Sequence, residues 1–242
     1  MIISELFSVM EIRQCEHIGL HHSLPPLKYG CKDDWGWDAN EKSDAVRLYG
    51  SKIAYFHPHY AHGTAAIKGS RVLNGGRYYW EVYLGDRVFG TSMSVGVGTK
   101  KARVWSQSFL NMVGEDENSW GLNHKGELWH GGECRLWTFP HKPCTIGVYF
   151  DGVAGTLSYY RDGVCLGVAF TGFLEVKESL YPIVCSTAAR TTMCLSVKKR
   201  EFFSLQDRCR QSIIQHLPHK EYIQDLEIPT ILKSYLQEGF VD

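Results

Sequence analysis

The stretch TIGVYFDGVAGTLSYYRDGVCLGVAF, from Thr145 to Phe170, decides the fold. It contains three short apolar runs, and an Asp-Gly pair follows each of the first two, at Asp151-Gly152 and Asp162-Gly163. Asp-Gly between alternating runs favours a hairpin, because a type I′ turn needs positive φ at both central residues. The stretch therefore predicts three antiparallel strands. A meander this apolar needs a second sheet to cover its inner face.

The rest of the chain up to residue 201 supplies that second sheet. Strand-sized segments rich in β-formers recur with Gly, Asn and Asp turn signals between them, at 45–49, 52–56, 78–84, 92–99, 119–123, 127–130, 181–186 and 192–197. A helical period is indicated only around 106–112. Regular short strands with turn signals are typical of an antiparallel β-sandwich. The predicted fold class is mainly β, a bent antiparallel β-sandwich.

The pattern becomes helical at Ser204, a good N-cap residue. Leu205, Cys209 and Ile213 recur at a spacing of four, which predicts an amphipathic helix that ends before Pro218. A short apolar pattern follows at 222–226, and Pro229 suits the first turn of a last helix. We therefore divide the chain into an N-terminal extension (1–30), the sandwich (31–201) and a three-helix appendage (202–242). About forty residues are too few for a self-sufficient core, so the appendage must dock on the sandwich, on a partner, or on both.

Composition excludes several classes of protein. The 26 basic and 26 acidic residues balance, so the chain lacks the excess of positive charge typical of nucleic-acid binders. No run approaches the roughly 20 apolar residues of a membrane span. The eight cysteines form no C-x-x-C pair, and several lie in apolar strand contexts, as in reduced intracellular proteins. The first fourteen residues make a poor signal peptide. We expect an intracellular protein, cytoplasmic or nuclear, with no nucleic-acid or membrane partner.

Motifs for catalysis or cofactor binding are weak. His57, His59 and His62 have loose spacing for metal ligands, and Pro58 interrupts them. The segment 96–101, GVGTKK, lacks the third Gly and the Gly-Lys-Ser/Thr ending of a phosphate loop, and a central strand explains it better. No local signature supports a Cys–His or Ser–His–Asp set. The sequence therefore predicts no metal, no cofactor and no enzyme activity of its own.

The strand region resembles the SPRY domain. The resemblance rests on five segments in order over about 150 residues: YWEV at 79–82, SVGVGT at 94–99, SWGL at 119–122 with GELWH at 126–130, the meander at 145–170, and LYPIV at 180–184. It implies a bent two-sheet sandwich that binds peptides and carries out no chemistry.

The appendage resembles a SOCS box. Leu205, Cys209 and Ile213 match the motif by which such boxes bind the adaptor of elongin B and elongin C. A Leu and a Cys one helical turn apart make a compact knob for a partner's groove. The later part resembles the cullin-selecting segment of the box, and the matching positions are Leu226, Ile228, Pro229, Leu232, Tyr235 and Leu236. The fifth-type cullin usually meets Leu-Pro-Leu-Pro, and here Glu227 replaces the first Pro and Ile228 the second Leu.

Together the two modules make the chain similar to the SPRY-domain and SOCS-box family of ubiquitin-ligase substrate receptors. The segments CSTAAR at 185–190, FHP at 56–58 and GTAA at 63–66 look most like the divergent third member of that family. The resemblance implies a non-catalytic receptor that brings a target to elongin B/C, a cullin and a RING protein for ubiquitination and proteasomal degradation. Two alternatives stay open: a SPRY scaffold without a ligase role, whose tail is a structural clasp, and a lectin-like sandwich.

The resemblance also places the target-binding face. Better-known relatives hold an Asn-rich peptide between three loops with an Arg, a Tyr, a Leu and a Trp-Gly pair. The corresponding positions are His57, Phe109, Met112 and Ala188-Ala189, where no residue type matches. Only the location of the face is therefore transferred. We expect it to comprise His57, His59, Tyr60, Ala61, Phe109, Met112, Val113, Ser186, Thr187, Ala188, Ala189 and Arg190.

Overall fold

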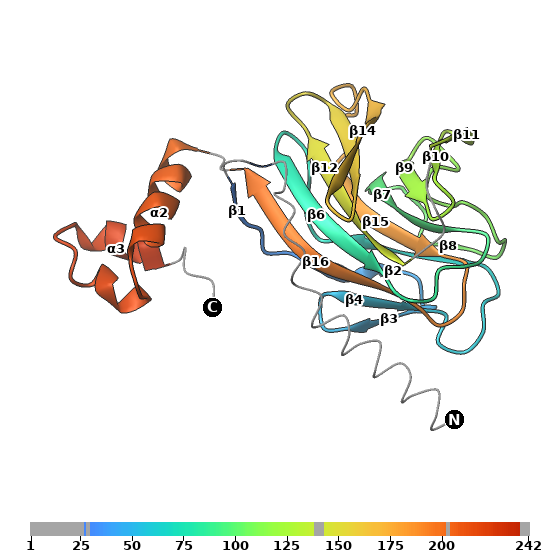
Figure 1. Cartoon of the computed structure of the whole chain (residues 1–242), viewed down its shortest axis with the longest axis horizontal. Helices are drawn as coiled ribbons and strands as arrows, with labels where there is room; N and C mark the ends of the chain where they lie inside the picture. The colour runs from blue at the N-terminus through green and yellow to red at the C-terminus, as the bar shows by residue number, and fades with distance from the viewer. Residues whose placement is uncertain (1–26, 28–29, 138–142, 202–203, 238–242) are drawn as a thin grey trace.

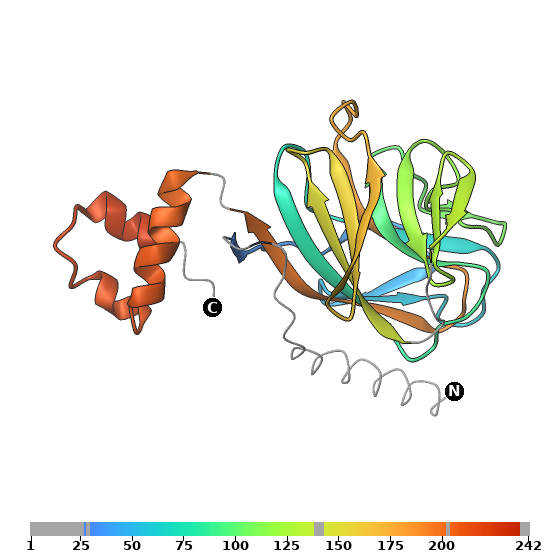
Figure 2. The ribbon, with the colours of Figure 1, turned by 45° about the horizontal axis from the view of Figure 1, so that its top comes forward.

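A computed structural model describes residues 27, 30–137, 143–201 and 204–237. These residues form two antiparallel sheets packed face to face, with a helical segment to one side (Figures 1 and 2). The first sheet runs in the order β14 (Val164–Thr171), β13 (Thr156–Arg161), β12 (Cys144–Asp151), β6 (Arg77–Leu84), β16 (Thr191–Glu201), β4 (Ile53–Phe56) and β3 (Val46–Tyr49), and β1 (Gly30–Lys32) pairs with β16. The second runs β11 (Glu133–Leu136), β10 (Glu127–His130), β9 (Ser119–Asn123), β7 (Met93–Thr99), β15 (Leu180–Ser186), β5 (Thr64–Gly69) and β2 (Trp37–Lys42), and β8 (Trp105–Ser106) pairs with β5.

The meander forms three consecutive strands of the first sheet, β12, β13 and β14, as the sequence predicts. Asp162 and Gly163 have φ of 45° and 80°, as a type I′ turn requires, and they join Arg161 directly to Val164. The first turn is longer than expected. The Asp151 carboxylate accepts hydrogen bonds from the backbone N–H groups of Val153 and Ala154, and a four-residue loop results.

The core lies between the two sheets and is rich in aromatic side chains. Trp80, Phe56, Phe150 and Tyr159 are among its fully buried members. The Tyr159 hydroxyl donates to the carbonyl of Val95 across the sandwich at 2.9 Å, so the buried phenol keeps a hydrogen bond. The outer face of the first sheet is also packed. Tyr79 lies beside Gly147, where a Cβ would stand 2.5 Å from its hydroxyl oxygen.

The end of β16 is held firmly to the sandwich. Arg77 on β6 bridges Asp151 at 2.9 Å and Glu201 at 2.8 Å, and these two carboxylates raise the pKa of the guanidinium. On the other side, β1 pairs with residues 199–201, and buried Asp33 contacts Arg71 and Arg200. The last residue before the helical segment is therefore fixed by a strand pairing and by an ion pair.

The helical segment contains α2 (Leu205–His216), the 3₁₀ helix η1 (Lys220–Ile223) and α3 (Thr230–Gln237). Its described part thus has two α-helices and one 3₁₀ turn, where the sequence predicts three helices. Ile223 and Leu236 are buried within it. The Arg210 guanidinium lies 4.3 Å from the Tyr235 ring centroid and joins α2 to α3. No described helix has the length and apolar character to span a bilayer.

The prediction of a helical segment around 106–112 is wrong, because Trp105 and Ser106 form β8 and the following residues form a loop. Of the N-terminal extension, only Leu27 and Gly30 are described, so the expected extension over 1–30 otherwise lies outside the described residues.

Candidate functional site

Three loops meet at one end of the sandwich, and direct bonds join them. The loop after β4 and the loop before β16 are joined because the Arg190 N–H donates to the carbonyls of Phe56 and His57 at 2.9 and 3.1 Å. The Thr64 hydroxyl donates to the Ser108 carbonyl at 2.7 Å, which joins the start of β5 to the loop after β8. The structure therefore brings together the three segments that the sequence analysis assigned to one face.

His57 lies at the centre of this junction. It is buried and has a φ of 48°, in the left-handed region. Its Nε2 lies 3.1 Å from the Ser186 carbonyl, which can only accept, so Nε2 carries the proton. Burial lowers the pKa of the imidazole, the Ser186 hydrogen bond partly opposes this, and His62 lowers the pKa further. His57 is thus neutral at pH 7, and its buried Nδ1 is an acceptor with no hydrogen-bond partner among the described residues.

A row of aromatic rings extends from His57 to the surface. The His62 ring lies 5.1 Å from Trp105 and 5.5 Å from Tyr60, and the His57 ring lies 6.3 Å from both His62 and Trp105. Tyr60 is 72% exposed. These rings form one wall of an open pocket of about 850 Å³. The end of β2, the following turn and β3 also line this pocket, with Lys42, Ser43, Asp44, Ala45 and Arg47.

Neither residues 42–47 nor Trp105 is predicted from the sequence to line a binding site. Residues 42–47 end ten residues before His57, on the other side of β4, and no pattern in them indicates binding. They reach the pocket because Ser43 N–H donates to the Ala66 carbonyl and His57 N–H donates to the Ala45 carbonyl. Trp105 is brought in by the short pairing of β8 with β5.

The expected face residues divide by exposure. His59, Tyr60 and Arg190 are exposed, Phe109 is 51% exposed, and Ala61 and Ala189 are half-buried. The other six are buried beneath the surface: His57, Met112, Val113, Ser186, Thr187 and Ala188. Of these six, His57 lines the pocket described above, and the other five shape the face from below.

Specific contacts explain the buried positions. Met112 and Val113 pack with Ile183 and Cys185 in a small second core. The Thr187 side chain exchanges hydrogen bonds with the backbone of Ser92, and Gly90 packs closely over Thr187 and Ala188. The segment before β7 therefore covers Thr187 and Ala188.

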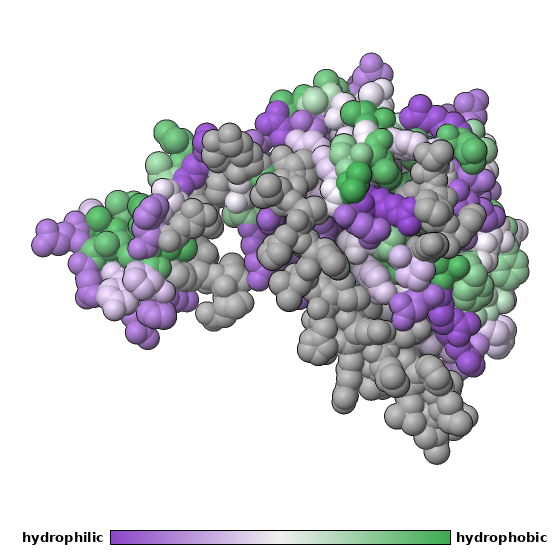
Figure 3. Space-filling model, in the orientation of Figure 1, coloured by the Kyte–Doolittle hydropathy of each residue, from purple (hydrophilic) through white to green (hydrophobic). Residues whose placement is uncertain are grey.

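The helical segment presents the predicted adaptor-binding residues on an open surface. Leu205 is 75% exposed, Ile213 is 41% exposed, and Cys209 lies one turn after Leu205 and is also exposed. Residues spaced by four lie on one face of a helix, so the three side chains form a continuous apolar stripe. Figure 3 shows hydrophobic surface on this part of the molecule.

The predicted cullin-binding residues are less uniform. Pro229 and Leu232 are exposed, whereas Leu226, Ile228 and Tyr235 are half-buried. Leu236 is buried inside the helical segment and holds α3 in place. Ile231, which was not predicted, is 78% exposed beside Leu232.

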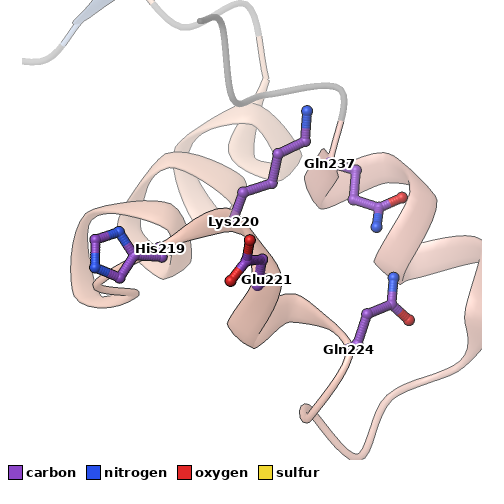
Figure 4. Close-up of a pocket in the computed structure, with 5 residues that line it drawn as sticks. All are labelled: His219, Lys220, Glu221, Gln224 and Gln237. Atoms are coloured by element: carbon purple, nitrogen blue, oxygen red, sulfur yellow. The ribbon is translucent and has the colours of Figure 1, made fainter.

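A second pocket lies in the helical segment and is polar and open. It has a volume of about 740 Å³ and is lined by His219, Lys220, Glu221, Gln224 and Gln237 (Figure 4). The His219 ring is directed away from the other four side chains, so the five do not converge on one point. Among the residues that the structure describes, no three His, Cys, Asp or Glu side chains gather as a metal site.

Comparisons with known proteins find two family models that match the chain. The SPRY domain family model matches residues 77–198, and the SOCS box model matches residues 201–237. The chain is 34% identical over 230 residues to SPRY domain-containing SOCS box protein 3 of Xenopus tropicalis, which covers 92% of this chain and 63% of that protein. It therefore spans less than two thirds of that relative. It is 31% identical over 231 residues to Protein gustavus of Drosophila melanogaster, covering 88% of this chain and 82% of that protein.

The fold comparison leads to the same architecture. The SPRY domain of human HERC1 superposes with a TM-score of 0.55 at 17% identity, covering 67% of this chain and 98% of that domain. At this identity the likeness concerns the fold alone. It supports the mainly β, two-sheet fold class predicted from the sequence.

Proposed function

Because the chain belongs to the SPRY domain-containing SOCS box family, we propose that it is a non-catalytic substrate receptor of a cullin–RING ubiquitin ligase. The sandwich, over 31–201, binds a short extended segment of an intracellular target protein. The helical segment, over 202–242, binds elongin C of the elongin B/C adaptor and then a cullin, the fifth type, with its RING protein. The target is ubiquitinated and sent to the proteasome.

The open apolar stripe on α2 is the observation that carries this proposal. The helix α2 exposes apolar surface at Leu205, Cys209 and Ile213. The helical segment has few other residues that could cover this surface. An amphipathic helix that leaves its apolar face open suits a hydrophobic groove on a partner. The receptor needs no catalytic group, because it raises the local concentration of target lysines near the conjugating enzyme.

Co-purification with elongin C tests the adaptor role. We expect the double variant Leu205→Ala, Cys209→Ala to lose elongin C, because truncating a central anchor costs at least about 2 kcal/mol, or roughly thirtyfold in affinity. The matched control is Ile231→Ala, which removes an equally exposed apolar side chain from α3 and should keep elongin C. Wild-type recovery of elongin C by the double variant would leave the helices as a structural clasp and the sandwich as a scaffold.

Target capture is tested separately in cells with the proteasome blocked. We expect Phe109→Ala combined with Arg190→Ala to lose target proteins while elongin C stays bound, since both side chains are exposed on the three-loop face. If the variant loses no protein, the binding face lies elsewhere.

Cullin choice is tested by exchanging Glu227 for Pro, which restores the first Pro that fifth-type cullins usually meet. A gain in binding of that cullin is the expected result.

A further inference from the structure

We propose that the pocket beside His57 is a subsite for one aromatic side chain that carries a hydrogen-bond donor, a tyrosine or a tryptophan of the bound target segment. The proposal rests on the proposed function, because it assumes that the sandwich binds a target. It specifies one side chain of the target. That side chain would bind among the aromatic rings and the turn after β2, and neither Phe109 nor Arg190 lines this pocket.

The aromatic wall favours a ring. Aromatic pairs prefer offset or edge-to-face contacts with centroids 4.5–7 Å apart, and the rings of His57, Trp105, His62 and Tyr60 already follow this spacing. Tyr60, the outermost ring, is mostly exposed, so it can pack against another ring. The pocket volume of about 850 Å³ falls within the range of sites that enclose sizeable ligands, and it exceeds what a small amide side chain fills.

His57 favours a ring with a donor. Its Nε2 is committed to the Ser186 carbonyl, so Nδ1 can only accept, and it is buried without a described partner. Leaving a buried acceptor unsatisfied is unfavourable, so a ligand that supplies an N–H or O–H gains more than an ordinary surface hydrogen bond. His57 is among the residues that line the pocket, together with the exposed side chains of Tyr60 and His62. Tyrosine and tryptophan combine a flat apolar body with one polar N–H or O–H.

The charges around the pocket disfavour ionised ligands. A carboxylate has no hydrogen to donate to Nδ1. A guanidinium or ammonium group would meet Lys42 and Arg47 in the pocket lining, where Asp44 is the single carboxylate. Lys42 also donates to the Ser43 carbonyl at 3.3 Å, which keeps its charge at the pocket edge. An uncharged donor avoids both penalties.

Side-chain analogues and nuclear magnetic resonance of the full chain test the proposal. The probes are p-cresol and 3-methylindole as donor-bearing rings, toluene as a ring without a donor, propionamide as an amide and butylguanidinium as a cation. The readouts are the Trp105 indole N–H signal, assigned with Trp105→Phe, and the ¹⁵N shift of His57 Nδ1. We expect p-cresol and 3-methylindole to shift both signals saturably and to bind about fivefold more tightly than toluene.

Two variants complete the test without disturbing the buried histidine. Tyr60→Ala should weaken p-cresol binding, because it removes the outer ring of the wall. Phe109→Ala is the matched control, since it removes an exposed ring that does not line the pocket and should leave p-cresol binding unchanged.

Three results would overturn the proposal: equal binding of toluene and p-cresol, stronger binding of propionamide or butylguanidinium than of p-cresol, or no saturable shift with either donor-bearing ring. None of them affects elongin C recovery or target loss in Phe109→Ala, Arg190→Ala. Failure of the subsite is therefore distinguishable from failure of the receptor function.

Discussion

Leu84 in the sandwich and Leu205 in α2 are the same type of amino acid in opposite surroundings. Leu84 lies between the two sheets and is 2% exposed, whereas Leu205 projects from the first turn of its helix. The difference extends to the two regions. The sandwich buries most of its large apolar side chains, while the helical segment exposes Leu205, Ile213, Ile231 and Leu232.

Length explains why the two regions differ. The sandwich has enough residues to enclose a core between two layers. The helical segment spans 34 described residues, 204–237, and has Ile223 and Leu236 as its buried apolar side chains. A segment of this size needs a partner to bury more. An apolar residue therefore stabilises the fold in one region and is available for binding in the other.

The largest expected effect comes from one substitution made in both regions. Leu84→Ala should lower the free energy of unfolding by about 2–5 kcal/mol, because it leaves a cavity between the sheets. Leu205→Ala should change it by less than about 0.5 kcal/mol, because the side chain is largely in solvent. Chemical denaturation followed by tryptophan fluorescence measures both. A comparable loss in Leu205→Ala would mean that α2 packs on the sandwich in solution.

The second effect is the response of each region to the adaptor. With elongin B/C at a hundred times its dissociation constant, binding should stabilise the segment that contacts it by about 2.7 kcal/mol. Amide hydrogen exchange should slow across 204–237 and stay unchanged in β12, β13 and β14. Uniform slowing over the sandwich would contradict the separation of the two regions.

The third effect concerns pH and the sandwich alone. Burial lowers the pKa of His57 in the folded chain, so the unfolded chain takes up this proton first as pH falls below about 6.5. Stability should therefore be highest above that pH and decline as pH falls toward the folded pKa. His57→Gln should make the decline shallower, because Gln can still donate to the Ser186 carbonyl without taking up a proton. Denaturation curves between pH 5 and 8 measure this.

The control for this prediction is His59→Gln. His59 is exposed on the same loop, so its replacement should leave the pH dependence of the wild type intact. Identical slopes for the wild type and His57→Gln would show that protonation of His57 is not coupled to folding.

The smallest effect lies inside the helical segment. The contact of Arg210 with Tyr235 should contribute about 0.5–1 kcal/mol, as cation–π pairs do at partly exposed sites. A double-mutant cycle with Arg210→Gln and Tyr235→Leu, followed by circular dichroism on melting, isolates this coupling. A coupling energy indistinguishable from zero would mean that the ring of Tyr235 adds nothing to the hydrogen bond from Arg210 to the Tyr235 carbonyl.

Much of the fold is predictable because local chemistry determines it. The Asp162-Gly163 turn has the positive φ values that Asp-Gly favours, and β9 and β10 have the predicted bounds. The missed strands lack local signals. β5 has the sequence TAAIKG, whose Ala, Lys and Gly are poor strand formers, and it is a strand because β15 and β2 pair with it on either side.

The candidate site is less predictable, because burial depends on distant segments. Thr187 and Ala188 look like an open loop in the sequence, and Gly90 and Ser92 cover them in the fold. The pocket at His57 is lined in part by Trp105 and by residues 42–47, and no sequence spacing indicates that these residues lie together. By contrast, the spacing of Leu205, Cys209 and Ile213 on one helix predicts their shared face directly.

The strand β16 determines how far apart the two ends of the molecule are. It begins at Thr191, next to the loop that carries Arg190, and ends at Glu201, which Arg77 and β1 hold. Eleven residues at roughly 3.3 Å each span about 35 Å, less where the strand is irregular between Leu195 and Lys198. In the proposed receptor the length of this strand contributes to the distance between the target-binding face and the adaptor-binding helix. It sets which lysines of a captured target come within reach of the conjugating enzyme, so lysines close to the bound segment and lysines far from it would be modified unequally.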